Sequence, residues 1–460
     1  MPLSDTATTE EFRASANRHL WLDNRDWTQM EAGGEPIIAV EGDGVRVTDS
    51  DGHSWIDVNG GYASVNIGYG RTEMADVVYD QMAALNYMPQ RSAIPPTVNL
   101  ARKLAQITPG TLSRSFLVSS GAEANETAIK VARAYHHRNG EPGRYKIISR
   151  FGSYHGDLGL VQWLGTRPDH STADYEPAYP GMVYAPQPNA YRCGAGDLSP
   201  SKCAVRCAKA VEELIRFHQP STVAAVIAEP VTNDGIVPGD EYWPMLREIC
   251  NEYGVVLIAD EVTTGFGRTG KMFGLEHWDV EPDIMTVAGG MSSSYMPVAA
   301  TIATTVIADR FAGPDSLFKH VFTFAGHPVA AAVALKNIEI IESENLADKT
   351  AKVGDYLKES LTTLIADHSI IGDVRGIGLL LAIELLSDRA TKAGLDPVMD
   401  IPKRLTAKFK DRGLILPVRG NIVSIAPPLT ITEPEVDEIV HAIDLALWEI
   451  EGELGIASFA

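Results

Sequence analysis

The chain has 460 residues, of which 45% are hydrophobic and 22% are charged, a composition typical of a globular protein. This length exceeds one ordinary hydrophobic core, so we expect two closely packed domains. The formal net charge of −21 disfavours binding to nucleic acid and to anionic membrane surfaces. A polyanion or a membrane is therefore not an expected partner.

The first residues have neither a basic start nor an apolar run, so no signal peptide is expected. No apolar stretch approaches the roughly 18 residues that would suggest a membrane span. Cys203 and Cys207 are four residues apart, but no histidine or further cysteine nearby completes a tetrahedral metal site. We predict a cytoplasmic protein without bound metal, in which Cys193, Cys203, Cys207 and Cys250 are reduced, structural thiols.

Short runs rich in branched residues alternate with amphipathic segments in the middle of the chain. The expected strands are 115–118, 146–148, 224–227, 255–258 and 284–287. The expected helices are 123–137, 199–217 and 242–253. This alternation predicts an α/β fold with a mostly parallel sheet between two layers of helices.

The two ends of the chain differ from this middle part. Turn-rich short strands are expected within 45–58, and long helices at 329–342 and 351–367. We predict a smaller α+β domain made from residues 1–75 and 329–460, beside a large domain at 76–328. No low-complexity linker separates them, so the two domains should share an interface.

The first motif with chemical meaning is Ser-Ser-Gly-Ala-Glu-Ala-Asn-Glu at 119–126, between an expected strand and an expected helix. Small residues at such a junction let backbone N–H groups converge on an anion. The helix N-terminus adds about half a positive charge. Taken alone, the motif also fits an ordinary helix N-cap.

A second motif, Gly-Ser-Tyr-His-Gly at 152–156, presents an aromatic ring on a turn. Tyr154 could stack on a flat ligand, although a single tyrosine on a turn is also compatible with simple packing.

A third motif begins at Asp260, directly after the expected strand 255–258, where α/β sheets place ligand contacts. A buried carboxylate there is costly unless it meets a positive partner, such as a protonated pyridine nitrogen. Residues 265–270 read Gly-Phe-Gly-Arg-Thr-Gly. We do not interpret them as a dinucleotide-binding loop, because no strong helix start follows.

In combination, these residues resemble the class III aminotransferases, the ω-aminotransferase branch of the fold type I pyridoxal phosphate enzymes. The resemblance spans nearly the whole chain. It implies a seven-stranded-type sheet, pyridoxal 5′-phosphate as cofactor, and a homodimer that shares its active sites. The motifs that carry it are Ser-Gly-Ala-Glu-Ala-Asn at 120–125, Tyr-His-Gly at 154–156, Ala-Glu-Pro-Val at 228–231, Ala-Asp-Glu-Val at 259–262 and Thr-Phe-Ala-Gly-His-Pro at 323–328.

The resemblance also implies roles for individual residues. Asp260 would pair with the pyridinium nitrogen, while Tyr154 and Val262 would cover the two faces of the ring. The other implied cofactor contacts are Ser120, Gly121 and Ala122 at the phosphate, His155 at the ring edge, Glu229 near the phenolic side or the substrate entrance, and Thr323 from the second subunit.

The catalytic lysine of the family is expected within Thr-Val-Ala-Gly-Gly-Met at 286–291, and this alignment places Gly289 at its position. That lysine holds the cofactor as a Schiff base and transfers a proton, and glycine can do neither. We therefore expect non-covalent binding of the cofactor or its substrate adduct and strongly impaired turnover. Either a deliberate substitution that traps an adduct or a natural loss explains the glycine.

The expected substrate-binding residues are Trp21, Tyr62, Ala63 and Arg419. Ala63 stands where relatives often carry tryptophan, which would leave room for a larger substrate. Pro417 stands where many relatives carry a carboxylate-binding arginine, with Arg419 two residues later. These departures leave three functions open: transamination between an amine or amino acid and a keto acid, a lyase or carbon–carbon bond-forming reaction on an amino acid, and an inactive cofactor-binding homologue.

Overall fold

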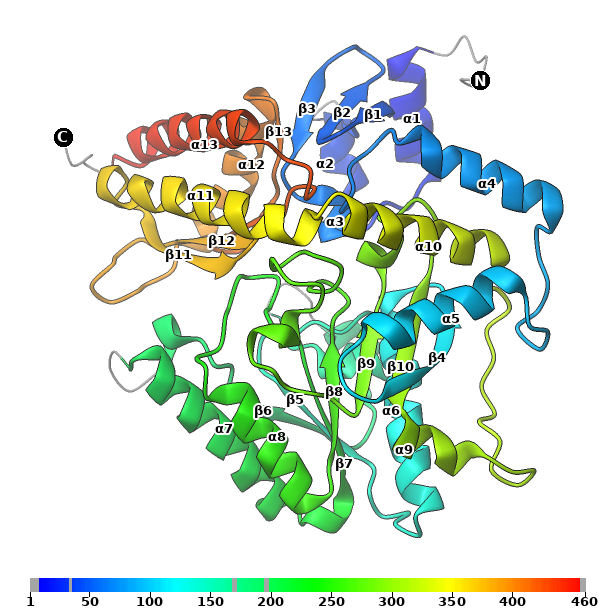
Figure 1. Ribbon diagram of the computed structural model, residues 1–460. Helices are drawn as coiled ribbons and strands as arrows, with labels where there is room; N and C mark the ends of the chain where they lie inside the picture. Colours follow the sequence, from blue (N-terminus) through cyan, green and yellow to red (C-terminus); the bar gives the residue numbers. More distant parts are fainter. Residues whose placement is uncertain (1–7, 33–34, 168–171, 194–197, 456–460) are drawn as a thin grey trace.

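The computed structural model describes residues 8–32, 35–167, 172–193 and 198–455 (Figure 1). Its largest sheet has seven strands in the order β4-β10-β9-β8-β7-β5-β6. Only β10 runs antiparallel to its neighbours, so the sheet is mostly parallel, as predicted. The strands are β4 (Leu112–Val118), β5 (Lys146–Arg150), β6 (Met182–Ala185), β7 (Val223–Ala228), β8 (Val256–Asp260), β9 (Ile284–Val287) and β10 (Ala299–Thr304).

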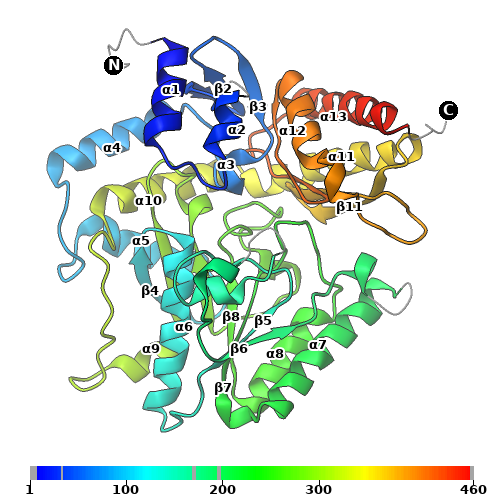
Figure 2. The same ribbon diagram turned by 180° about the vertical axis from the view of Figure 1, so that it is seen from behind.

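Helices cover both faces of this sheet. Every residue of β7 and β8 is buried, a pattern that requires a helical layer on each side. Alternate β7 residues pack against opposite layers: Ile227 faces α6 (Gly121–Arg138), and Val226 faces α7 (Pro200–Phe217) and α8 (Tyr242–Tyr253). Figure 2 shows α6 in front of the sheet, with α7 and α8 behind it.

The two chain ends meet in a four-stranded sheet with the order β1-β2-β3-β13. Its strands are β1 (Ala39–Asp43), β2 (Arg46–Asp49), β3 (Ser54–Asp57) and β13 (Leu414–Ile415), and β13 is parallel to β3. A second four-stranded sheet, order β11-β12-β15-β14, is antiparallel and consists of β11 (Ile371–Ile377), β12 (Leu380–Leu385), β14 (Val418–Arg419) and β15 (Ile422–Ile425). The domain boundaries at residues 75 and 328 stay predictions.

The remaining helices surround these sheets. α10 packs against α4 and α5, and α11 and α12 pack against α13. The helices are α1 (Thr9–His19), α2 (Trp27–Ala32), α3 (Gly60–Ala63), α4 (Thr72–Ala84), α5 (Pro95–Ile107), α9 (Thr305–Ala308), α10 (Pro328–Ser343), α11 (Leu346–Asp367), α12 (Ile401–Asp411) and α13 (Glu433–Leu454). The short 3₁₀ helices are η1 (Val161–Leu164), η2 (Ala173–Tyr175), η3 (Ala190–Arg192), η4 (Pro220–Thr222), η5 (Gly274–His277), η6 (Gly289–Met291), η7 (Asp309–Phe311) and η8 (Pro397–Met399).

One prediction about the cysteines is wrong. Cys193 and Cys203 form a disulfide with their Cα atoms 6.1 Å apart, whereas Cys207 and Cys250 are free and buried. The sequence pattern does not show that the end of η3 lies against the first turn of α7, and this proximity makes the bond possible. Among the described residues, no helix is long and apolar enough to cross a membrane.

Candidate active site

Asp260 is the last residue of β8, and its carboxylate is buried at the carboxyl end of the sheet. One oxygen accepts hydrogen bonds from Asn125 Nδ2 at 2.8 Å and from His155 Nδ1 at 2.6 Å. The other accepts from the backbone N–H of Val262 at 3.1 Å. The carboxylate is thus held by donors from α6, the 152–156 turn and the segment that follows β8.

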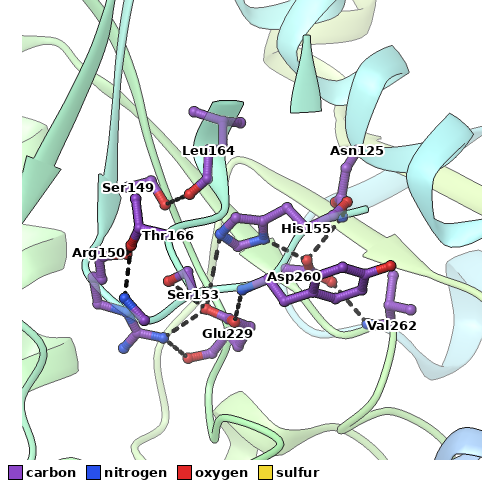
Figure 3. Close-up of polar contacts among 12 residues, drawn as sticks. Asn125, Ser149, Arg150, Ser153, His155, Leu164, Thr166, Glu229, Asp260 and Val262 are labelled. Carbon is purple, nitrogen blue, oxygen red and sulfur yellow. Dashed lines mark hydrogen bonds and ion pairs between the residues drawn. The ribbon is translucent and has the colours of Figure 1, made fainter. Parts of the chain in front are cut away.

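His155 lies between two carboxylates (Figure 3). Its Nε2 is 3.8 Å from Glu229 and has no hydrogen-bond partner among the described residues. Burial alone would lower the pKa of His155, but the negative charges of Glu229 and Asp260 outweigh burial and raise it. The imidazolium form is therefore favoured beside Asp260.

Glu229 is buried beside the 152–156 turn, and its place relative to the cofactor or the substrate entrance stays a prediction. Its carboxylate accepts hydrogen bonds from Arg150 Nη2 at 2.9 Å, from Ser153 Oγ at 3.1 Å and from the backbone N–H of Tyr154 at 3.1 Å (Figure 3). Burial raises the pKa of Glu229, but the charges of His155 and Arg150 and the Tyr154 N–H outweigh it and hold the pKa at about 2. Glu229 therefore acts as the anionic anchor of the turn that carries Tyr154.

The N-terminus of α6 lies against Val262. Ser120 is the N-cap, and its hydroxyl accepts from the N–H of Glu123 at 3.2 Å. A Cβ on Gly121 would lie 2.7 Å from a Val262 methyl and 3.5 Å from Ala288 Cβ. Gly121 is therefore required for the close approach of α6 to the residues after β8 and β9.

The 152–156 turn also contacts α6, because Gly156 leaves no room for a side chain beside Ala122. Tyr154 donates from its hydroxyl to Asp157 at 3.0 Å, and the guanidinium of Arg167 lies 5.8 Å from the ring centre of Tyr154. Burial and the charge of Asp157 raise the pKa of Tyr154. The two motifs that the sequence predicts to contact the cofactor, at 119–126 and 152–156, are thus adjacent in the structure.

Gly289 begins η6 directly after β9, one residue beyond the Ala288 that faces Gly121. A Cβ on Gly289 would lie 2.6 Å from Ser64 Cβ. Ser64 follows a turn in which Gly60, Gly61, Tyr62 and Ala63 all have φ between 54° and 62°. Asp57 stabilises this left-handed turn by accepting the N–H of Gly61 at 2.8 Å.

The expected substrate residues border the same edge. Tyr62 is exposed, donates to Asp23 at 2.7 Å and lies 5.6 Å from the guanidinium of Arg419. Ala63 is buried, whereas Trp21 is 87% exposed and contacts Trp27. Tyr62 and Arg419 are thus adjacent, whereas the ring contact found for Trp21 within the described residues is with Trp27 and not with another expected substrate residue.

Thr323 is exposed on a turn, where its carbonyl oxygen accepts from Tyr87 Oη at 2.6 Å. The preceding Phe322 packs against the small cluster that includes Val262 and Ala288. The Thr323 segment therefore approaches the site region of its own chain, and its assignment to a second subunit stays a prediction.

The family model of class III aminotransferases matches residues 29–447. The chain belongs to this family. It is 39% identical to the taurine–pyruvate aminotransferase of Bilophila wadsworthia over 438 residues, which cover 92% of this chain and 94% of that protein.

Solved structures agree with this family assignment. An (S)-enantioselective ω-transaminase from Thermomicrobium roseum is 37% identical, with a TM-score of 0.94 and coverage of 97% of this chain and 100% of that chain. An amine transaminase from an uncultivated Pseudomonas species, solved with pyridoxal phosphate bound, is 35% identical, with a TM-score of 0.89 and coverage of 94% and 98%. The fold type I architecture is thereby confirmed.

Pyridoxal phosphate is the cofactor of this aminotransferase, and the residues around Asp260 fit it. A buried carboxylate suits a protonated pyridine nitrogen, and the Ser120-capped N-terminus of α6 suits a phosphate. Val262 lies between these two places.

Four residues of the aminotransferase site were not among the predicted contacts. Asn125 and Thr286 orient Asp260, since Thr286 donates to Asn125 Oδ1 at 2.7 Å. Arg150 pairs with Glu229. Arg268, fully buried within the glycine-rich 265–270 segment, donates to Asn66 Oδ1 at 2.9 Å and to the carbonyl oxygens of Ala63, Leu379 and Pro427.

A sequence signal was present for two of them. Asn125 ends the recognised Ser-Gly-Ala-Glu-Ala-Asn motif, and Arg268 lies in the Gly-Phe-Gly-Arg-Thr-Gly segment. Burial lowers the pKa of Arg268 to about 9, which leaves its guanidinium charged at neutral pH. Through Arg268, the 265–270 segment connects residues 63–66 with Leu379 and Pro427. The segment is followed by the 3₁₀ helix η5 rather than by the helix that a dinucleotide-binding loop needs.

Proposed function

We propose that Gly289 occupies the position of the Schiff-base lysine and that the chain, as written, binds pyridoxal phosphate without a covalent bond. The observation that carries this proposal is the place of Gly289. It follows β9, the strand beside Asp260, and its neighbour Ala288 faces Gly121 at the α6 N-terminus. With glycine there, no side chain holds or transfers a proton at this point of the site. A deficit on the order of 10²- to 10⁴-fold is expected from the loss of a positioned base alone.

The reaction that we propose for the lysine-bearing form is transfer of an amino group from an amine or amino acid to a keto acid. When bound, the cofactor supplies an electron sink for the carbon that carries the amine. Asp260 would hold the ring nitrogen and Val262 would restrict the ring position, while Glu229 fixes the turn of Tyr154. The relative named for taurine and pyruvate supports a keto acid acceptor.

Two guanidinium groups support recognition of an anionic substrate group. Arg419 lies beside Tyr62, Arg167 lies over Tyr154, and the charges of both arginines act on the Tyr154 phenol. A guanidinium binds a carboxylate through paired, charge-assisted hydrogen bonds. We propose that Arg419 or Arg167 binds the acceptor carboxylate, and that Ala63 and Tyr62 limit the size of the donor.

The proposed functional unit is a cytoplasmic homodimer. The exposure of Thr323, whose hydroxyl is assigned by family resemblance to the phosphate of the other subunit, supports a shared site. Light scattering of the purified chain at several concentrations tests this assembly. A monomer at all concentrations would contradict it.

The decisive experiment introduces Gly289→Lys, alone and with Ser64→Gly, because Ser64 occupies the space next to residue 289. Incubation with pyridoxal phosphate, borohydride reduction and peptide mapping should place the cofactor on residue 289. Gly289→Arg is the matched control, since it supplies a long cationic side chain that forms no stable Schiff base.

Product analysis of the lysine-bearing form separates the three functions left open by the sequence. Formation of a ketone or keto acid together with pyridoxamine phosphate supports transamination. Substrate consumption without pyridoxamine phosphate supports a lyase or a carbon–carbon bond-forming reaction. Cofactor attachment at residue 289 with no turnover of any amine supports an inactive homologue, and a cofactor attached elsewhere would refute the assignment of Gly289.

A further inference from the structure

Three cysteine sulfurs gather where α7 begins. Cys193 directly follows η3, while Cys203 and Cys207 lie four residues apart on one face of α7. The three Sγ atoms lie within 4.8 Å of one another, and Cys193 and Cys203 are bonded. The cluster lies in the apolar core between α7, α8 and the sheet.

The η3 turn that precedes Cys193 is attached to the C-terminal part of the chain. Arg192 pairs with Glu384 on β12 and donates to the carbonyl oxygen of Lys392 at 3.0 Å. Lys392 Nζ donates to the carbonyl oxygen of Tyr191 at 3.0 Å and lies 4.6 Å from the Tyr191 ring centre. Figure 1 shows the loop after β12, in orange, on the same side of the molecule as α7.

We propose that Cys193 and Cys203 form a redox-responsive disulfide, which tethers η3, and through it the 384–392 segment, to α7. The bond completes a chain of contacts: Cys203 on α7, Cys193, the adjoining Arg192, and Glu384 on β12. Among the described residues, opening the disulfide leaves the apolar packing of Ala190 and the contact between Cys207 Sγ and the carbonyl oxygen of Gln187 to connect this segment with α7. In the proposed cytoplasmic location, disulfides are characteristically transient or redox-sensing.

The chemistry needs a thiol–disulfide couple such as glutathione. On oxidation, glutathione disulfide accepts two electrons, the two cysteine thiols become one disulfide, and two glutathione thiols take up the two protons. Reduction is the reverse exchange. Cys207 is the neighbouring free thiol, and its Sγ contacts the carbonyl oxygen of Gln187 at 3.5 Å.

The test uses the full-length chain with Gly289 unchanged, equilibrated in glutathione buffers of graded redox ratio. Free thiols are blocked with one alkylating agent, and disulfide thiols are then reduced and blocked with another. Peptide mapping should show Cys193 and Cys203 changing label together, while Cys207 and Cys250 stay free throughout. Cys250→Ser, a substitution of a buried cysteine on α8, should leave the transition unchanged, whereas Cys203→Ser should abolish it.

Hydrogen–deuterium exchange reports on the tether. Reduction, or Cys203→Ser, should increase deuterium uptake in 186–193 and 386–392 and leave the β7 and β8 segments unchanged. Equal uptake in both redox states would overturn the tether. Three results would overturn the assigned disulfide. The first is four free thiols at every glutathione ratio, and the second is a Cys193–Cys207 linkage. The third is stoichiometric zinc that protects Cys193, Cys203 and Cys207 from alkylation.

Discussion

Ser64 Cβ lies 2.6 Å from the point at which a Cβ on Gly289 would stand. A side chain at position 289 would therefore meet Ser64 directly. The backbone of Gly289 itself would accept a side chain, because Gly289 is not among the described glycines with positive φ. Its surroundings are therefore fitted to a residue without a side chain.

Gly289→Ala is expected to destabilise the chain by about 1–3 kcal/mol, the usual cost of inserting a methyl group into a packed site. Ser64→Gly should recover most of this loss, since it removes the atom in contact. Urea unfolding of both single variants and the double variant measures the coupling. Additive effects of the two substitutions would contradict the clash.

Glu229→Gln is expected to destabilise the chain by about 3–5 kcal/mol, because it leaves the buried Arg150 guanidinium without its anionic partner. Glu438→Gln breaks an exposed pair with Arg46 and should cost at most about 1 kcal/mol. Since the pKa of Glu229 is about 2, below that of the unfolded carboxyl, its stabilisation is complete above about pH 4.5 and is lost as the pH falls towards 2. Equal effects of the two substitutions in denaturant unfolding would refute the anchoring role.

Glu261 should make the free energy of unfolding depend on pH in the sense opposite to that of Glu229. Burial raises its pKa to about 7, despite hydrogen bonds from Thr264, Gly274 and Leu275. Because the folded carboxyl keeps its proton to a higher pH than the unfolded one, its contribution is full below about pH 4.5 and declines as the pH rises through 7. Denaturant unfolding between pH 5 and 8 should show this decline in the free energy of unfolding. Glu261→Gln should remove the decline. If the variant shows the same pH dependence as the unmodified chain, Glu261 is not its source.

Asp260→Asn is expected to weaken pyridoxal phosphate binding by about 10- to 100-fold, the range for losing one hydrogen bond to a charged group. The amide replaces the negative charge that faces His155 and that is proposed to pair with the ring nitrogen. Equilibrium dialysis with the unmodified Gly289 background measures the affinity without any need for turnover. Asp437→Asn, which alters an exposed carboxylate bonded to Tyr356, serves as the control and should bind the cofactor normally.

Arg419→Ala, made together with Gly289→Lys, is expected to raise the KM of a keto acid acceptor by about 10- to 100-fold. The KM of an uncharged amine donor should change little, since that substrate offers no carboxylate. Arg167→Ala provides the comparison between the two guanidinium groups. If neither substitution changes the keto acid KM, the proposed carboxylate site is wrong.

The sequence predicted the central sheet well because its strands are buried on both faces and its helices have clear apolar periodicity. The expected helix 242–253 and strand 284–287 agree with α8 and β9 at both ends. Two strands, β6 and β10, were missed. β10 reads Ala-Ala-Thr-Ile-Ala-Thr, which lacks the dense branched residues of its neighbours, and it forms only through pairing with β4 and β9.

The candidate site was recognised through short sequence motifs. Such motifs identify the residues of a site better than they identify the hydrogen bonds between those residues. Asp260 was predicted as a buried carboxylate, but its three-way coordination by Asn125, His155 and the Val262 N–H depends on the arrangement of three separate segments. The position of Glu229 beside the turn and the Cys193–Cys203 bond likewise depend on contacts between segments far apart in sequence. No local pattern encodes such contacts.

The parallel pairing of Ile56 with Leu414 also has a consequence for how the protein is made. β3 leads directly into the left-handed turn with Tyr62, and β13 lies just before Arg419, so this edge of the site joins early and late parts of the chain. A ribosome exposes residues around 56 long before residue 414 emerges, and contacts so distant in sequence form slowly. The proposed substrate edge is therefore expected to form late, after translation is nearly complete.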